Sequence, residues 1–253
     1  MAPKRFFNGI STVSSGDPLG ALEVLDPTKW SMYFEDFVGP LFNTASIAST
    51  TVTENGLLVT ASTNATITTT TDAGGLDGCL SIVTTAADNE SGLIQTSSPG
   101  WVLTSGKKFL METKFELTTT AGTIEQAELF IGLATNQTGA DFFATDGTAR
   151  TFDDGIGWYS PDADTDIDLI CGEADVFDNI TVKATYVTAT WYTMSMYYDG
   201  TDIYTWVNGV DSGCLTPSAI PVSVVGPTFY MKTGEAKANT LLVDYLMVAK
   251  ERT

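Results

Sequence analysis

The residues that could perform chemistry in this chain are mostly carboxylates. The sequence has 31 Asp and Glu, 12 Lys and Arg, and no His, which gives a net charge of -19 over 253 residues. Without imidazole, a Ser-His-Asp or Cys-His nucleophile is excluded, and the usual general base near neutral pH is missing. The charge also excludes nucleic-acid binding through a basic surface, because phosphate backbones would repel the protein.

The strongest local pattern is an acidic stretch at 141–178. Within it, carboxylates stand at loop positions 1, 3, 5, 7 and 12 of an EF-hand calcium loop: Asp162, Asp164, Asp166, Asp168 and Glu173. An EF-hand is rejected, because Ile167 stands where the sharp turn needs Gly and the flanks read as strands. Two interpretations stay open: a solvated acidic loop, which we prefer, and a calcium ion held in another way near Asp162, Asp164, Asp166 and Asp168.

Glu112 and Glu116 are the carboxylates that raise the question of a glycosidase. They lie four residues apart on one face of a predicted strand, which separates them by roughly 13 Å. Retaining hydrolysis needs about 5 Å and inverting hydrolysis less than about 10 Å. We therefore expect two surface charges on a wet face, and no enzyme.

Aromatic residues are the groups that could stack on sugar rings, as they do in lectins. The candidates are Trp158, Tyr159, Trp191, Tyr192, Tyr197, Tyr198, Tyr204 and Trp206. In a sandwich, one member of each neighbouring pair must face the core, so about half need no ligand. Met194 and Met196 point the same way in their strand and are expected to fill the core.

The elements that must position these residues are short strands. The range 107–117 alternates apolar and charged residues, which predicts a strand with one wet face, and 179–186 alternates with Ile180, Val182, Ala184 and Tyr186 inward. The range 241–248 places Leu242, Leu246 and Val248 on one face with Asp244. Short runs at 129–133 and 155–159 are of the same type. No segment has helical periodicity.

Turn dipeptides join three strands into a meander. The strand 191–198 stops at Asp199-Gly200, and the strand 203–207 stops at Asn208-Gly209, both of which supply the positive φ angles of tight hairpins. Many short strands at intervals of about ten residues predict an all-β antiparallel sandwich, jelly roll or barrel.

The first 29 residues differ from the rest of the chain. Pro and Gly recur there without alternation, which predicts an extended N-terminal arm at 1–29 followed by one β domain at 30–253. Cys79, Cys171 and Cys214 are widely spaced and odd in number, which favours assembly in a reducing compartment. The start lacks the apolar run of a secretory signal, and no apolar stretch is long enough for a transmembrane helix.

Two sets of residues carry a resemblance to known proteins. The meander from Trp191 to Gly209 and the last strand through Val243-Asp244-Tyr245 resemble a laminin-G or concanavalin A-like jelly roll. The two chain ends resemble tailed-bacteriophage proteins that decorate the head. The segments concerned are Lys4 to Ile10, Asp17 to Gly20, Asp26 to Lys29, Tyr33 to Phe37, Thr233 to Ala236 and Ala249 to Arg252.

The second resemblance implies a non-enzymatic virion protein on the outer surface of a capsid, assembled in the host cytoplasm as a homo-oligomer. The implied partners are the major capsid protein and other copies of the chain, without nucleic acid or membrane. The expected contact residues are Lys4, Arg5, Phe6, Phe7, Asn8, Pro18 and Leu19. The alternatives are a glycan-binding adhesin with the same fold and a β-sandwich glycanase, which would need a carboxylate pair facing each other across a cleft.

Overall fold

The computed structural model is built of strands only in the part of the chain that it describes. It describes residues 6–7, 10–11, 29–37, 47–48, 51–54, 56–70, 78–119, 127–137, 142–143, 150–162, 164–174 and 176–252. Within these ranges, no helix is long and apolar enough to span a membrane. The all-β prediction is therefore confirmed.

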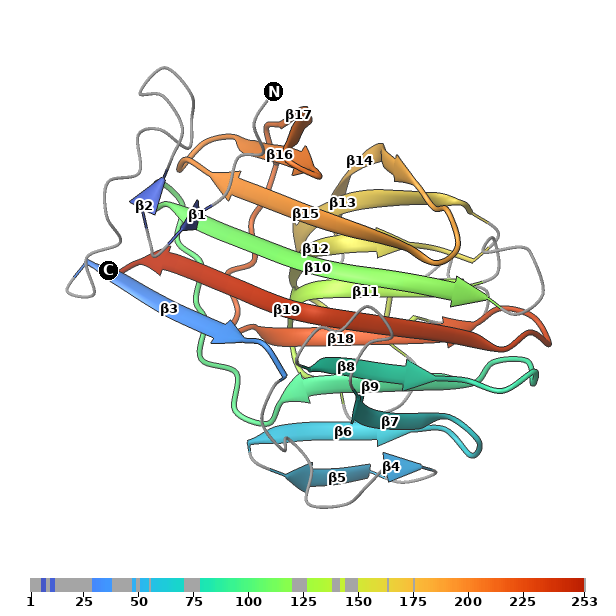
Figure 1. Cartoon of the computed structure of the whole chain (residues 1–253). Helices are drawn as coiled ribbons and strands as arrows, with labels where there is room; N and C mark the ends of the chain where they lie inside the picture. The colour runs from blue at the N-terminus through green and yellow to red at the C-terminus, as the bar shows by residue number, and fades with distance from the viewer. Residues whose placement is uncertain are drawn as a thin grey trace.

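Two antiparallel sheets stack as the layers of a sandwich (Figure 1). Sheet 1 has nine strands in the order β17-β16-β15-β10-β19-β8-β7-β4, with β3 paired to β19. Its strands are β3 (Trp30–Glu35), β4 (Ile47–Ala48), β7 (Thr66–Thr70), β8 (Cys79–Val83), β10 (Phe109–Thr119), β15 (Thr190–Tyr198), β16 (Ile203–Val207), β17 (Val210–Leu215) and β19 (Asn239–Glu251).

Sheet 2 has eight strands in the order β14-β13-β12-β11-β18-β9-β6-β5. They are β5 (Thr51–Glu54), β6 (Leu57–Ala61), β9 (Ser91–Thr96), β11 (Ala127–Ala134), β12 (Gly155–Ser160), β13 (Asp166–Glu173), β14 (Val176–Thr185) and β18 (Gly226–Thr233). A separate small sheet pairs β1 (Phe6–Phe7) with β2 (Ile10–Ser11). Whether 1–29 forms an arm stays a prediction.

The main core lies between the two sheets and follows the predicted alternation. Met194 and Met196 of β15 are buried in it, which confirms their role as core filling. Ala184 and Tyr186 also pack there as predicted, whereas the side chains of 180–183 lie outside the described residues. Burial of such apolar surface is the largest favourable contribution to folding.

The meander β15-β16-β17 is confirmed, and its turns fall at the two predicted dipeptides, although Asp199 itself does not have a positive φ. Asn208 and Gly209 have φ angles of 50° and 75°, as a tight hairpin of this type requires. Between β15 and β16, the carboxylate of Asp199 accepts hydrogen bonds from the backbone N–H groups of Thr201 and Asp202. Gly200, with φ of 108°, completes that turn.

A β-bulge in β19 corrects one predicted face. Lys114 lies opposite Tyr245 while its neighbour Phe115 lies opposite Val243, so Asp244 is an extra residue in the ladder. The buried positions change from odd to even at this point: Leu241 and Val243, then Leu246 and Val248. The prediction that Leu242 shares a face with Leu246 and Val248 is wrong, because alternation alone does not contain the extra residue.

The outer faces of both sheets carry apolar clusters of their own. On sheet 1, Trp30, Leu110, Tyr197, Trp206 and Ala249 are buried. The predicted wet face of 107–117 is therefore buried at Leu110 and Glu112 and reaches solvent only in part, at Lys114 and Glu116.

On the outer face of sheet 2, the buried rings of Phe142, Phe143 and Phe152 pack over Phe130. Glycines make room for these rings. A Cβ on Gly155, for example, would come within 2.6 Å of Phe152.

Candidate functional site

An open cavity of about 410 Å³ lies between the two sheets, beside the end of β3. Its lining residues are Tyr33, Glu35, Gly56, Leu57, Thr96, Ser97 and Ser98. Tyr33 and Glu35 come from sheet 1 and the remaining residues from β6, β9 and the turns beside them in sheet 2. Ligand sites in proteins have volumes of roughly 300–1,000 Å³, so the cavity is large enough for a small molecule.

Tyr33 and Glu35 occupy alternate positions of β3 and therefore face the same side. They lie opposite Val248 and Leu246 of β19, which point into the core. Burial, and then the nearby carboxylate of Glu35, raises the pKa of Tyr33 to about 12. The phenol therefore keeps its proton at neutral pH, where it can donate and accept hydrogen bonds.

One oxygen of Glu35 is fixed by the backbone. Its Oε1 accepts a hydrogen bond from the N–H of Phe37, at 3.1 Å. The ring of Phe37 is buried against Phe229, which anchors this end of β3 to sheet 2. The carboxylate is thus held in one orientation while its second oxygen stays available for another donor.

The opposite wall of the cavity is a tight turn. Gly56, with φ of +80°, connects β5 to β6, and its carbonyl accepts a hydrogen bond from the N–H of Ser97 at 2.8 Å. Leu57 pairs with Thr96 in the ladder between β6 and β9. The hydroxyl-bearing segment 96–98 is therefore held by sheet 2 on one side of the cavity.

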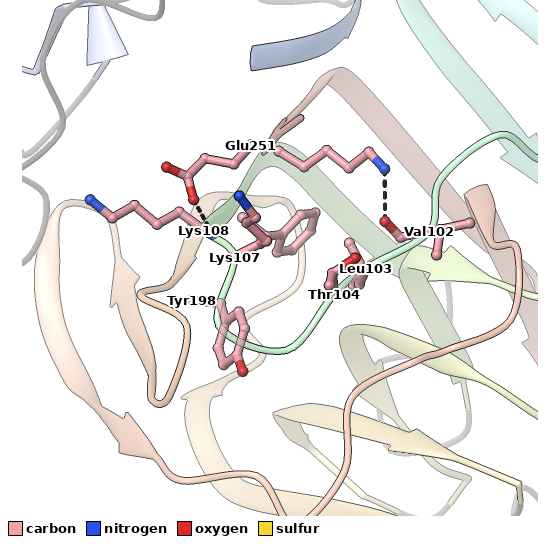
Figure 2. Close-up of a pocket in the computed structure, with 9 residues that line it drawn as sticks. Val102, Leu103, Thr104, Lys107, Lys108, Tyr198 and Glu251 are labelled. Carbon is pink, nitrogen blue, oxygen red and sulfur yellow. Dashed lines mark hydrogen bonds between the residues drawn. The ribbon is translucent and has the colours of Figure 1, made fainter. Parts of the chain in front are cut away.

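A second cavity, at the end of the sandwich where β10 begins, is too small for a substrate. Its volume is about 10 Å³, close to that of a single water molecule. Figure 2 shows Glu251 beside Lys107 and Lys108, with Tyr198 on the other side. Glu251 accepts a hydrogen bond from the N–H of Lys108, and Lys250 donates to the carbonyl of Val102. These contacts close the end of the core.

The predicted capsid-contact residues are not tested by the structure. Lys4, Arg5, Asn8, Pro18 and Leu19 lie outside the described residues. Phe6 and Phe7 are described only as the backbone of β1. Their assignment to a contact surface stays a prediction.

The acidic stretch is not the solvated loop that we expected, because β12, β13 and the start of β14 run through it. Asp154 is buried and accepts hydrogen bonds from the N–H groups of Ala174, Val222 and Ser223. Burial opposes ionisation of Asp154, but the bonds from Ser223, Ala174 and Val222 outweigh it and lower the pKa of the carboxyl. Asp178 holds Ser218 of the same loop. These carboxylates fasten a loop to the sheet.

Three of the four carboxylates proposed for calcium, Asp164, Asp166 and Asp168, accept described hydrogen bonds from protein donors. Asp164 accepts from the N–H of Asp166, Asp166 from the hydroxyl of Thr185, and buried Asp168 from the amide of Asn179. Because β13 begins at Asp166, the stretch cannot wrap around an ion as an EF-hand loop does. The described residues contain no group of three or more His, Cys, Asp or Glu suited to a metal ion.

Glu112 contradicts the prediction of a surface charge. It is 4% exposed, and its carboxylate accepts hydrogen bonds from the hydroxyls of Ser195 at 2.8 Å and Tyr245 at 2.7 Å. Glu116 is half-buried and accepts from the hydroxyl of Thr118. Neither carboxylate lines either of the two cavities described above, so this strand contributes no glycosidase pair to them.

The aromatic candidates for sugar stacking are largely core residues. Six of the eight are buried, because apolar clusters lie on the outer face of each sheet as well as in the main core: Trp158, Tyr159, Tyr192, Tyr197, Tyr198 and Trp206. Trp191 is half-buried and has the ammonium of Lys114 4.8 Å from its ring centre. Tyr204 stacks on Tyr197. The expectation that about half would be core is too low.

The sequence analysis did not predict the cavity, although the alternation of residues in β3 could have indicated one of its walls. In β3, Met32 and Phe34 are exposed while Tyr33 and Glu35 alternate with them toward the interior. A carboxylate on the inward face of a strand is unusual and marks a polar interior. The other wall comes from Gly56 and from 96–98, and only the folded chain brings these segments together.

Comparison with solved structures identifies the architecture. Arcelin-5, a lectin-like defense protein from Phaseolus vulgaris, superposes with a TM-score of 0.55 at 12% identity, covering 88% of this chain and 100% of that one. The carbohydrate recognition domain of Emp47p gives 0.53 at 13% identity, over 90% and 99%. The protein is a concanavalin A-like jelly roll.

An enzyme also shares this fold. The endo-β-1,4-glucuronan lyase from Trichoderma reesei superposes with a TM-score of 0.51 at 13% identity, covering 87% of this chain and 95% of that one. No protein-family model matches the sequence, and no curated protein does. Identities this low establish the jelly roll alone, so function must be argued from the site.

Proposed function

We propose that this jelly roll binds a saccharide in the cavity beside β3. The observation that carries the proposal is an open space of about 410 Å³ between the sheets, lined by a carboxylate, a phenol and two serines. Such groups donate to and accept from sugar hydroxyls, and the cavity is of monosaccharide rather than polymer size. The lectin-like protein and the carbohydrate recognition domain that share the fold give independent support.

Binding without catalysis fits the lining better than hydrolysis does. Glycoside hydrolysis normally uses two carboxylates about 5 to 10 Å apart. Among the described residues of the cavity, Glu35 is the one carboxylate. Tyr33 has its pKa raised to about 12, which makes it a poor general base near neutral pH.

Isothermal titration with glucose, galactose, mannose and glucosamine tests the proposal. We expect binding of at least one of these sugars with a Kd in the millimolar range or tighter. Tyr33→Ala should weaken it about tenfold, because it removes a hydrogen-bonding ring from the cavity wall. The matched control is Met32→Ala, which truncates the next residue of the same strand on the opposite, exposed face.

Two outcomes would contradict saccharide binding in this cavity. One is the absence of heat with all four sugars at concentrations of tens of millimolar. The other is an equal loss of affinity in Tyr33→Ala and Met32→Ala, since that would place the sugar elsewhere or reflect general damage to β3.

Decoration of a capsid is a second proposal, and it concerns the N-terminal residues. The separate sheet of β1 and β2 is consistent with an arm that stands apart from the sandwich. Deletion of residues 1–29 should leave a folded jelly roll that no longer co-purifies with phage heads, because the basic and aromatic contact residues are removed. Full occupancy of heads by the truncated protein would refute the arm assignment.

A further inference from the structure

The charge of the cavity lining restricts which sugars it can accept. Among its described residues, Glu35 is the one charged side chain. The described lining residues therefore offer no cation to compensate this carboxylate when it faces a ligand. A second carboxylate brought within about 4–6 Å would be repelled, whereas an ammonium group would be attracted.

The structure also holds that carboxylate in place before a ligand arrives. The N–H of Phe37 fixes Oε1 of Glu35, and the buried ring of Phe37 packs on Phe229. A fixed acceptor loses little freedom on binding, so a hydrogen bond to its second oxygen is formed at low entropic cost. Such a bond is stronger when the donor is charged than when it is a neutral hydroxyl.

The neighbouring groups add no preference for an anion. The phenol of Tyr33 stays protonated and neutral, and it lies close enough for Glu35 to raise its pKa. The carbonyl of Gly56 and the N–H of Ser97 are already bonded to each other. The opposite wall of the cavity is therefore neutral, and Glu35 decides the sign of the charge that the site tolerates.

We infer that the cavity takes neutral sugars and amino sugars with a free amine, and that it rejects uronic acids. This inference rests on the proposed function, because it specifies the ligand of the same site. It distinguishes this protein from the glucuronan lyase that shares its fold and whose name denotes a polyuronate substrate. The physical basis is one oriented carboxylate, Glu35, to which the described lining residues add no compensating cation.

The test is a comparison of glucose, glucosamine and glucuronate with the wild-type protein, at a pH at which the amine is protonated. We expect glucosamine to bind about tenfold more tightly than glucose, and glucuronate at least tenfold more weakly. In Glu35→Gln, which keeps the acceptor for Phe37 but removes the charge, the three affinities should come within about threefold of each other. The wild-type comparison stands even if this variant fails to fold.

The outcomes separate the two claims. If glucuronate binds as well as glucose, or if Glu35→Gln retains the full discrimination, the inference about charge is overturned while saccharide binding stands. If none of the three sugars binds, the proposed function fails and the inference fails with it.

Discussion

The buried carboxylate of Glu112 is held by two neutral hydroxyls, and no ion pair among the described residues involves it. Ser195 and Tyr245 donate to it from the two strands that flank β10, so three strands of sheet 1 meet at this side chain. Hydrogen bonds to a charged group are worth about 1.5–3 kcal/mol each, and loss of one partner leaves the other groups unsatisfied.

We expect Glu112→Ala to lower the free energy of unfolding by about 2–4 kcal/mol, because it empties a buried site and leaves two hydroxyls without their acceptor. Glu116→Ala is the control, on the same strand and face but only half-buried, and should cost less than about 1 kcal/mol. Urea denaturation followed by circular dichroism measures both. Equal losses would show that Glu112 is as dispensable as a surface charge.

Glu112 also shows which features of a strand the alternation of residues can predict. Alternation correctly assigned Glu112 to the face opposite Met111, because that depends only on the period of two. It did not reveal that Leu110, Tyr197 and Trp206 would cover part of that face. Burial of an outward face depends on segments distant in sequence, and for this reason the predicted surface charge was wrong.

At the scale of the strands, the centre of sheet 2 depends on two opposed glycines. Gly132 of β11 lies directly opposite Gly157 of β12, and a Cβ on Gly132 would come within 2.3 Å of the carbonyl oxygen of Ile156. The atoms in the way belong to the backbone and cannot rotate aside. The ring of Phe130 packs over the same space, so the glycines allow the aromatic cluster to lie flat on the sheet.

Gly132→Ala should therefore destabilise the protein by about 2–4 kcal/mol, as overpacking of a rigid site does. Gly100→Ala provides the control, because no heavy atom lies within 4 Å of a Cβ at that position. Thermal unfolding of the two variants should show a clear drop in Tm for the first and a change near zero for the second. A Gly132→Ala variant with wild-type Tm would mean that β11 and β12 are less closely packed than described.

The strands and turns were predicted correctly where the types of neighbouring residues determine the backbone conformation. The meander was readable because Asn208, Gly209 and Gly200 take positive φ angles that few other residues adopt. The bulge at Asp244 was not readable, since it depends on the register between β10 and β19. The acidic stretch at 141–178 was predicted wrongly because its charge suggested a solvated loop. Asp154 and Asp168 are instead buried hydrogen-bond acceptors.

At the scale of the whole molecule, the charge of -19 has two consequences. It repels polyanions electrostatically, and at the cavity it is expressed by the single carboxylate of Glu35 among the described lining residues. Strand spacing predicted a sandwich, jelly roll or barrel, and the resemblance of the meander and last strand selected the jelly roll. The cavity was not predictable, because its walls come from two sheets and from turns far apart in sequence.

The most direct test of saccharide binding at β3 is an NMR titration of the isotope-labelled protein with glucosamine. We expect the largest shifts of backbone amide signals at Gly56, Leu57 and Ser97, since these groups form the wall that a bound sugar would touch. Shifts confined to another surface, such as the outer face of sheet 2 around Tyr159, or no shifts at all, would contradict the proposed site.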